Sequence, residues 1–230
     1  MAVLLFDIDG TLVRGAGAGK RAMARAFHGE LAHGVAGLDH VQFHGNTDRS
    51  IVREALLAMG SRCSDDDIDR VLAAYVEALA LEVAETRPFR ALAGAQPLLE
   101  RLAGARGLAL GLGTGNVRAG ALLKLASVGL ASYFGFGGYG CDAEARDALL
   151  AIGARRGAEH LGVSPGTVQV VVIGDTVRDI RAARAIGASV LAVATGGSTA
   201  AELAAEAPDL LVASLEDPRA AAMLLASSAS

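Results

Sequence analysis

The stretch FDIDGTL (residues 6–12) follows the short apolar run AVLL (residues 2–5) at the start of the chain. An apolar run that ends abruptly in acidic residues, glycine and threonine indicates a buried strand whose carboxyl end opens into a loop. Carboxylates two residues apart in an extended chain lie about 6 to 7 Å apart on one side of the backbone, a separation that can bracket a phosphate-sized group. The stretch therefore predicts that one of Asp7 and Asp9 attacks and the other carries a proton.

The composition predicts a cytoplasmic protein without an extended charged surface. The chain has 230 residues, 52% of them hydrophobic and 4% aromatic, enough for one core or for one core and a smaller lobe. Its net charge of −4 gives no electrostatic footprint for nucleic acid, and no apolar run is long enough to cross a bilayer. The two cysteines, Cys63 and Cys141, are far apart and indicate reduced thiols. We expect no nucleic-acid or membrane partner, and a monomer or weak homodimer.

The residues after the first strand predict a separate helical lobe. The small-residue stretch 14–19 indicates a hinge. Helical spacing of apolar residues then begins at Lys20, resumes over 47–59 and begins again after Ser64, which is expected to cap the third helix, with no strand pattern between these segments. Pro88 restricts the backbone where the chain returns. We therefore expect a helical cap at 15–88, inserted into a core of residues 1–14 and 89–230.

From residue 89 onward, predicted helices and strands alternate. The strands are expected at 108–113, 133–136, 168–173, 189–193 and 209–212, with helices between the first four of them, a final helix from about residue 217 and a frayed tail at 227–230. Alternation of this kind builds a parallel sheet that is covered by helices on both faces. The sequence therefore predicts an α/β fold, a Rossmann-like doubly wound sheet with an inserted helical cap.

Ligands of such sheets bind outside the carboxyl ends of the strands, near the switch in strand order. Polar residues follow four of the predicted strands at these ends. They are Asp7 and Asp9 with Gly10 and Thr11, then Thr114, Gly115 and Asn116, then Arg146, and finally Asp175. The topology therefore predicts that acids, a hydroxyl and a cation converge on one rim of the sheet.

The motif at residues 7–12 resembles the first motif of the haloacid dehalogenase superfamily of phosphohydrolases. The stretch LALGLGT (residues 108–114) ends a strand in threonine and resembles the second motif. The stretch VVIGDTVRD (residues 171–179) carries Gly-Asp with a further acid four residues on, and resembles the fourth. The resemblance covers nearly the whole chain and is to the phosphoglycolate phosphatase-like branch, whose members carry helical caps.

This resemblance implies a magnesium-dependent phosphatase that acts on a small phosphomonoester. Asp7 would attack phosphorus to form an aspartyl-phosphate, and Asp9 would act as the acid and base. The Thr114 hydroxyl and neighbouring N–H groups would hold a phosphoryl oxygen. The Mg²⁺ ligands would be Asp7, the backbone carbonyl of Asp9, and Asp175, with Asp179 beside them to fix a metal-bound water or the cation. Another interpretation is that Asp179 only holds its loop.

The third motif of the superfamily usually supplies lysine, and this chain has no lysine after Lys124. Arg146 falls at the right interval and resembles the arginine that part of the phosphoglycolate phosphatase-like branch uses there. Arginine can hold a phosphate and a carboxylate together through its planar fork. Lys124, on the helix after Thr114, is the rival candidate for this cation.

The loop FHGNTD (residues 43–48) resembles the substrate-specificity loop of helical-capped members, which implies substrate contacts from Gly45, Asn46 and Thr47. An equally good interpretation is that Asn46, Thr47 and Asp48 cap the following helix. Further substrate-binding candidates follow the ends of two strands: Gly10, Thr11, Gly115 and Asn116.

Two other functions remain open on the sequence. A sugar phosphomutase that resembles β-phosphoglucomutase would use the same Asp7 and Asp9 but would shield the phospho-enzyme from water. A non-catalytic binding protein of the same fold is the second, although the intact set of acids argues against it. A dinucleotide-binding loop at 111–115 is disfavoured because the full glycine spacing is missing.

Overall fold

The computed structural model describes residues 1–30, 38 and 41–229 and contains one six-stranded parallel sheet. The strand order is β5-β4-β1-β6-β7-β8. The strands are β1 (Ala2–Phe6), β4 (Leu108–Thr114), β5 (Phe136–Tyr139), β6 (Gln169–Gly174), β7 (Ser189–Val193) and β8 (Leu210–Val212). Strand β1 pairs in parallel with both β4 and β6, so the order runs outward from β1 in both directions. This confirms the predicted doubly wound α/β fold.

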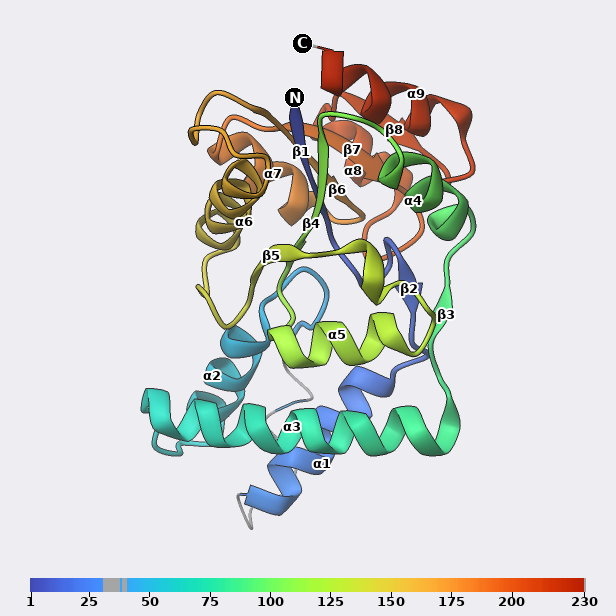
Figure 1. Cartoon of the computed structure of the whole chain (residues 1–230). Coiled ribbons are helices and arrows are strands. Elements are labelled where there is room, and N and C mark those ends of the chain that lie inside the picture. Colours follow the sequence, from blue (N-terminus) through green and yellow to red (C-terminus); the bar gives the residue numbers. More distant parts are fainter. Residues whose placement is uncertain (31–37, 39–40, 230) are drawn as a thin grey trace.

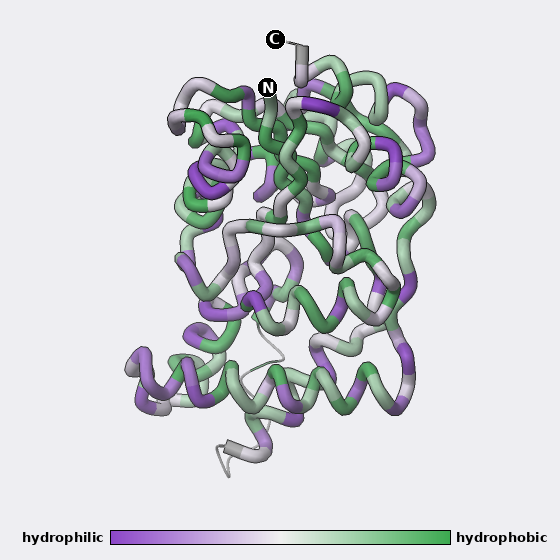
Figure 2. The backbone as a smooth tube through the Cα atoms, in the orientation of Figure 1, coloured by the Kyte–Doolittle hydropathy of each residue, from purple (hydrophilic) through white to green (hydrophobic). Residues whose placement is uncertain are grey.

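Helices cover both faces of this sheet (Figure 1). Helices α6 (Arg146–His160) and α7 (Val177–Ala185) lie on one side, and α4 (Ala95–Ala103) and α9 (Pro218–Ala226) lie on the other. All of β1 is buried, and its alternate residues enter two different cores. Val3 and Leu5 pack with α6 and α7, whereas Leu4 and Phe6 pack with α4 and α9. Figure 2 shows the strands at the centre of the sheet as a hydrophobic region.

Three helices at one end of the molecule form what we call the helical segment (residues 18–86): α1 (Ala18–Glu30), α2 (Asp48–Ala58) and α3 (Asp65–Thr86). It lies beyond α5 (Arg118–Ala126) and away from both chain ends (Figure 1). The chain enters and leaves it through the antiparallel pair β2 (Val13–Arg14) and β3 (Arg90–Ala91). The sequence did not predict this pair, because two residues are too few to show a strand pattern.

Apolar packing attaches the helical segment to α5 and to the first of the two cores. Met23 and Phe27 of α1 pack in one cluster with Tyr75 and Leu79 of α3. The same cluster continues through Ala121 of α5 to the sheet. None of the described helices is both long enough and apolar enough to cross a membrane.

Several boundaries differ from the predictions. The strand predicted at 133–136 begins at Phe136, and residues 131–133 form the 3₁₀ helix η1 (Ala131–Tyr133). The ring of Phe134 packs edge-on against Phe6 at 5.9 Å between centroids, so this aromatic residue belongs to the core contact before the strand. In β5, a Cβ on Gly138 would lie 1.8 Å from the Leu149 carbonyl, so the close packing of α6 requires glycines that weaken the strand pattern.

Two further differences concern the carboxyl-terminal third of the chain. Helix α8 (Ala200–Ala205) was not predicted, although Thr199 and Glu202 form a capping box at its start. The predicted frayed tail is instead the 3₁₀ helix η2 (Ser227–Ala229), because Ser227 is buried and donates a hydrogen bond to the Leu224 carbonyl. Most of the loop predicted around 34–44 lies outside the described residues.

Candidate active site

A cavity of about 550 Å³ lies between the carboxyl ends of the strands and the helical segment. Most of the candidate site residues that the sequence indicated line this cavity. These are Asp7, Asp9, Gly10, Gly45, Asn46, Gly115, Asn116, Arg146 and Asp175, with Lys124 as well. Four other candidates, Thr11, Thr47, Thr114 and Asp179, are buried directly behind this lining. The strand ends therefore bring the candidates together at one place.

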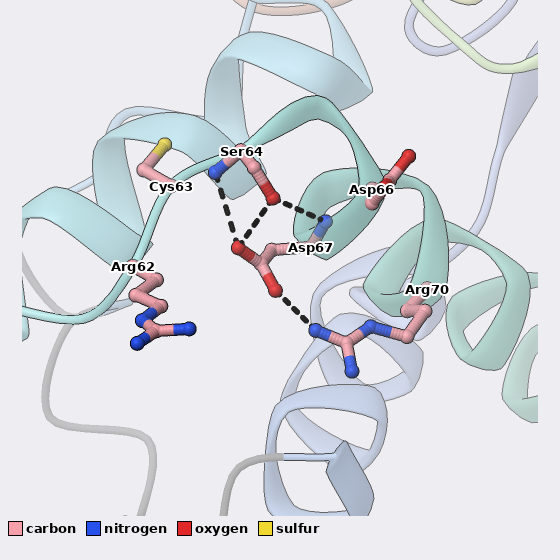
Figure 3. A pocket seen from close by; sticks show the side chains of 6 residues that line it. All are labelled: Arg62, Cys63, Ser64, Asp66, Asp67 and Arg70. Atoms are coloured by element: carbon pink, nitrogen blue, oxygen red, sulfur yellow. Dashed lines mark hydrogen bonds and ion pairs between the residues drawn. The ribbon is translucent and has the colours of Figure 1, made fainter.

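A second hollow, at the start of α3, contains none of these candidates (Figure 3). Its polar groups serve the helix itself. Ser64 and Asp67 form a capping box in which each side chain accepts a hydrogen bond from the backbone N–H of the other, and Arg70 pairs with Asp67. The predicted cap at Ser64 is confirmed. The polar groups of this hollow stabilise the N-terminus of α3 and belong to no candidate site.

The turn after β1 is shaped by contacts with Asp175. The Asp7 N–H donates to the Ile173 carbonyl at 2.9 Å, which aligns the ends of β1 and β6. Gly10 has φ +88°, and a Cβ there would lie 2.5 Å from Asp175 Oδ2, so only glycine fits. The Thr11 hydroxyl donates to Asp175 Oδ1 at 2.9 Å. Gly10 and Thr11 therefore position an acid of the neighbouring strand.

Asp7, Asp175 and Asp179 form what we call the acid cluster. One carboxylate oxygen of each lies within 4.8 Å of the others, and all three residues are buried. Among the residues that the structure describes, one cation contacts the cluster: Arg146 Nη2 lies 3.1 Å from Asp7 and 2.5 Å from Asp179, and its Nε donates to Asp179 at 2.7 Å. The cluster therefore carries two negative charges in excess when all groups are ionised.

The excess charge appears in the titration of the acids. Burial raises the pKa of Asp7 to about 6 although Arg146 opposes the rise, and Asp179 and Asp9 add to it. Burial and the charges of Asp7 and Asp179 also raise the pKa of Asp175 well above its usual range. Buried carboxylate oxygens that repel one another are ligands suited to a hard divalent cation. The residues present therefore fit a metal ion.

Asp179 is also a structural residue of helix α7. Its Oδ2 accepts hydrogen bonds from the Thr176 N–H at 3.0 Å and from the Thr176 hydroxyl at 2.7 Å, and Thr176 caps the helix in return. Its other oxygen receives Arg146. Asp179 thus connects the helix start to the cation of the acid cluster.

Asp9 lies in different surroundings, which we call the Asp9 network: Asp9, Asn116, Lys124 and Thr114. Asp9 Oδ2 accepts from Lys124 Nζ at 2.6 Å and from Asn116 Nδ2 at 2.9 Å. Asn116 also donates to the Thr114 hydroxyl and accepts from Lys124. Burial acts to lower the pKa of Lys124, but the charges of Asp9, Tyr75 and Asp48 outweigh it and raise that pKa, so the ammonium stays charged.

The loop at 43–48 is attached to the strand end at 115–117. The Asp48 N–H donates to the Gly115 carbonyl at 2.8 Å, and the Asp48 carboxylate accepts from the Val117 N–H at 2.8 Å. A Cβ on Gly115 would lie 2.4 Å from the Asn46 carbonyl, so the close approach of this loop requires glycine. Burial raises the pKa of Asp48 to about 6 although Lys124 opposes the rise.

Within this loop, Thr47 is the N-cap of α2 and forms a capping box with Ser50. The Asn46 side chain donates to the Gln42 carbonyl at 2.6 Å and so closes its own loop. The Gly45 carbonyl accepts a long hydrogen bond of 3.5 Å from Arg146 Nη1. The capping interpretation is confirmed for Thr47, and the backbone of Gly45 lies beside the acid cluster.

The segment after β7 was missed by sequence reasoning. The Gly197 N–H donates to Asp175 Oδ2 at 2.6 Å, and the Thr195 hydroxyl donates to the Gly10 carbonyl at 2.6 Å. Arg14 donates to the Thr195 carbonyl. A Cβ on Gly196 would lie 1.8 Å from Asp175 Oδ2, so the segment touches the acid directly. A glycine pair three residues beyond the end of a predicted strand was the available signal.

Comparison with solved structures shows that this fold is shared. CbbY from Rhodobacter sphaeroides in complex with phosphate has a TM-score of 0.70 and 19% identity, over 94% of this chain and 95% of that chain. A predicted phosphoglycolate phosphatase from Haemophilus somnus has a TM-score of 0.68 and 17% identity, over 94% and 96%. A putative β-phosphoglucomutase from Thermotoga maritima has a TM-score of 0.59 and 20% identity, over 94% and 96%.

Sequence comparison gives the family. No curated protein matches the sequence. The family model of haloacid dehalogenase-like hydrolases matches residues 1–187, which include the three strand ends, those of β1, β4 and β6, that supply the acid cluster and the Asp9 network. The resemblance seen in the motifs is therefore confirmed, and the chain belongs to the haloacid dehalogenase-like hydrolases.

Proposed function

We propose that the protein is a Mg²⁺-dependent phosphohydrolase that cleaves a small phosphomonoester through an aspartyl-phosphate on Asp7. The observation that carries this proposal is the pairing of two unlike acids on one cavity. Asp7 belongs to a buried acid cluster with an excess of negative charge, whereas Asp9 is half exposed and is held by Lys124. When bound by the cluster, Mg²⁺ would neutralise charge on the substrate phosphate and on the acids.

Asp7 is the proposed nucleophile because it follows the central strand and contacts Arg146. Its carboxylate attacks phosphorus, and the bond between phosphorus and the leaving oxygen breaks. Asp9 gives a proton to that oxygen, and later takes one from the water that hydrolyses the aspartyl-phosphate. Such acid and base catalysis contributes about 10² to 10⁴ in rate.

Other residues would hold the phosphate and the metal. The Thr114 hydroxyl and the N–H groups of Gly115 and Asn116 at the end of β4 are the proposed donors to phosphoryl oxygens. Asp7, the carbonyl of Asp9 and Asp175 are the proposed metal ligands. For Asp179 we propose a supporting role, because both of its oxygens are engaged by Thr176 and Arg146.

Arg146 is the proposed phosphate-neutralising cation, in preference to Lys124. Its Nη2 group is buried, makes ion-pair contacts with Asp7 and Asp179, and forms no hydrogen bond of good geometry with any of the described residues. A donor in this condition has capacity left for a phosphoryl oxygen beside the nucleophile. Lys124, in contrast, donates to Asp9 and Asn116.

We propose further that residues 15–88 act as a cap on a core of residues 1–14 and 89–230. The cavity is lined both by strand ends and by the helical segment, including Met23 and Tyr75. The loop carrying Gly45, Asn46 and Thr47 lies against the strand end at Gly115, where it would exclude water and contact the leaving group.

A phosphate-release assay over a panel of small phosphomonoesters tests this function. Hydrolysis that requires Mg²⁺, is abolished by a chelator and is absent in Asp7→Asn is the expected result. An isomer formed without phosphate release would identify a phosphomutase, which would use the same two acids. No turnover of any ester, with phosphate binding retained, would identify a binding protein.

A further inference from the structure

The strongest feature that the proposed function does not use is the buried ammonium of Lys124. We propose that Lys124 is a positioning residue that fixes one oxygen of Asp9 and leaves the other to transfer the proton. This inference rests on the proposed function, since it assigns a geometry to the acid of that reaction. It is carried by three hydrogen bonds: Lys124 to Asp9 at 2.6 Å, Lys124 to Asn116 at 2.6 Å, and Asn116 to the same Asp9 oxygen at 2.9 Å.

The two oxygens of Asp9 differ in their surroundings. Oδ2 accepts from both Lys124 and Asn116, so both of its lone pairs are engaged. No hydrogen bond from the described part of the chain reaches Oδ1. A proton on Asp9 therefore resides on Oδ1. When the bond from phosphorus to the leaving oxygen breaks, the electron pair stays on that oxygen and the proton moves to it from Oδ1, while Asp7 forms the new bond to phosphorus.

The same hydrogen bonds connect Asp9 to the phosphate-holding end of β4. Asn116 Nδ2 bridges Asp9 and the Thr114 hydroxyl, with distances of 2.9 and 2.8 Å. Lys124 holds the amide in this orientation, because its ammonium occupies the amide oxygen. The proton donor and the proposed phosphate donor are thus kept at a fixed spacing by one amide and one ammonium.

The helical segment holds Lys124 in turn. Lys124 is only 4% exposed; its ammonium lies 5.9 Å from the centre of the ring of Phe89, which lies outside the helical segment, just before β3. A Cβ on Gly19 would lie 3.8 Å from both the ammonium and the Tyr75 hydroxyl, which puts α1 and α3 directly against it. Withdrawal of the helical segment would remove this packing. Asp9 is therefore fully positioned only when the helical segment is docked, which couples proton transfer to closure.

The test compares kcat/KM for 4-nitrophenyl phosphate and phenyl phosphate, two esters of similar shape. Phenolate is the poorer leaving group and depends more on a proton from Asp9. The measured quantity is kcat/KM for 4-nitrophenyl phosphate divided by kcat/KM for phenyl phosphate. We expect Asp9→Asn to raise this ratio by about tenfold or more, and Lys124→Met to raise it by several-fold. This ratio does not change with the fraction of enzyme that is folded, so partial misfolding of a variant does not obscure it.

Three further variants sharpen the test. Lys124→Arg keeps a donor for Asp9 and should return the ratio toward the wild-type value. Tyr75→Phe, which removes only the hydroxyl beside the ammonium, should shift the ratio in the same direction as Lys124→Met but less. Lys20→Met removes the only other lysine, from the same cavity, and should keep the wild-type ratio whatever happens to the absolute rates.

An unchanged ratio in Lys124→Met, beside a raised ratio in Asp9→Asn, would overturn the positioning role. An equal loss on both esters in Lys124→Met would also overturn it, since it would indicate that Lys124 neutralises phosphate. If the wild-type protein hydrolyses neither of these esters nor any member of the wider panel, the proposed function is wrong, and the positioning role is wrong with it. This result differs from an active wild-type protein with an unchanged ratio in Lys124→Met, which would overturn the positioning role alone.

Discussion

Asp7 and Asp9 are two residues apart at the end of one strand, yet their side chains differ in exposure and in charged partners, because Asp7 belongs to the acid cluster and Asp9 to the Asp9 network. The side chain of Asp7 is 9% exposed, pairs with an arginine that also pairs with Asp179, and lies beside a third buried carboxylate, that of Asp175. The side chain of Asp9 is 45% exposed and has a lysine of its own. The buried negative charge of the acid cluster exceeds the positive charge beside it, which favours binding of a metal ion there. The charge of Asp9 is instead balanced by that of Lys124, so its side chain does not require a metal ion. The comparison thus distinguishes the proposed nucleophile from the proposed proton carrier by their surroundings.

The largest expected effect is that of Asp7→Asn, which removes the proposed nucleophile from the acid cluster. We expect kcat to fall by about 10⁴-fold or more, because the aspartyl-phosphate cannot form. The stability should be unchanged or raised, since a neutral amide relieves repulsion in the cluster. Steady-state kinetics and thermal unfolding of the same preparation measure both. Substantial Mg²⁺-dependent turnover in the variant would contradict the division of roles between the two acids.

The second prediction sets the two cations against each other. Arg146→Ala should lower kcat on 4-nitrophenyl phosphate by about 10² to 10³, because it removes the only cation at the acid cluster among the described residues. Lys124→Ala should lower it by about tenfold or less, because that ester depends little on Asp9. Arg146→Lys keeps the positive charge but lacks the planar guanidinium, so it separates the effect of charge from that of geometry. We expect it to retain more activity than Arg146→Ala. The reverse ranking of the two alanine variants would overturn the assignment.

The third prediction concerns the charge excess of the acid cluster. The folded Asp7 titrates near 6 and the unfolded one near 3.8, so the folded state binds the extra proton between these values. The stabilisation from that proton is complete below about pH 4 and is lost as the pH rises through about 6, an effect of at most about 3 kcal/mol. The metal-free protein should therefore lose stability over this window.

Mg²⁺ should reverse that loss. At 100 times its Kd the ion stabilises the fold by about 2.7 kcal/mol, so the Tm should rise by about 5 to 10 °C at pH 7.5. The rise should be smaller at pH 5, where Asp7 is largely protonated and binds the metal poorly. Differential scanning fluorimetry at both pH values measures it, with Asp175→Asn as the control that loses the effect. Equal shifts at both pH values, or in the variant, would contradict the metal site.

The sequence predicted the acid cluster better than the Asp9 network, for a physical reason. Asp7, Asp175 and Asp179 follow strands with strong apolar runs, and the rule that ligands bind at strand ends brings such residues together. Lys124 lies inside a helix, ten residues beyond the end of β4, and its partner Asp9 lies 115 residues away in the chain. No periodicity indicates such a pairing, so Lys124 was considered only as a rival cation.

The same distinction explains what was missed elsewhere. The Gly196 and Gly197 backbone contacts Asp175, and backbone contacts carry no side-chain signature beyond the need for glycine. The pair β2 and β3 was missed because each strand has two residues and depends wholly on its partner. In contrast, the capping of α3 by Ser64 is local, and a serine directly before the helical pattern was sufficient to predict it, although the reciprocal bond with Asp67 was not predicted.

The smallest expected effect lies outside both regions, in the ion pair that joins α2 to the start of α6. Arg53 donates to Glu144 at 2.6 and 2.9 Å, and the two side chains are 34% and 33% exposed. Glu144 lies two residues before Arg146, and its carbonyl accepts from the Thr47 hydroxyl. This pair therefore connects the helical segment to the acid cluster, whereas Tyr75 connects it to the Asp9 network.

We expect Glu144→Gln to raise KM about twofold and to leave kcat nearly unchanged, because a partly exposed ion pair contributes less than about 1 kcal/mol. In the wild-type protein, added salt should raise KM in the same way, and the variant should respond less. Glu206→Gln is the matched control, since it removes an ion pair of the same 2.6 Å length, between Arg181 of α7 and the end of α8, without touching the helical segment. If Glu144→Gln behaves like this control, the Arg53–Glu144 pair does not contribute to docking of the helical segment. Docking then depends on the contacts of Asp48, Tyr75 and Lys124, and only the Asp9 network is coupled to closure.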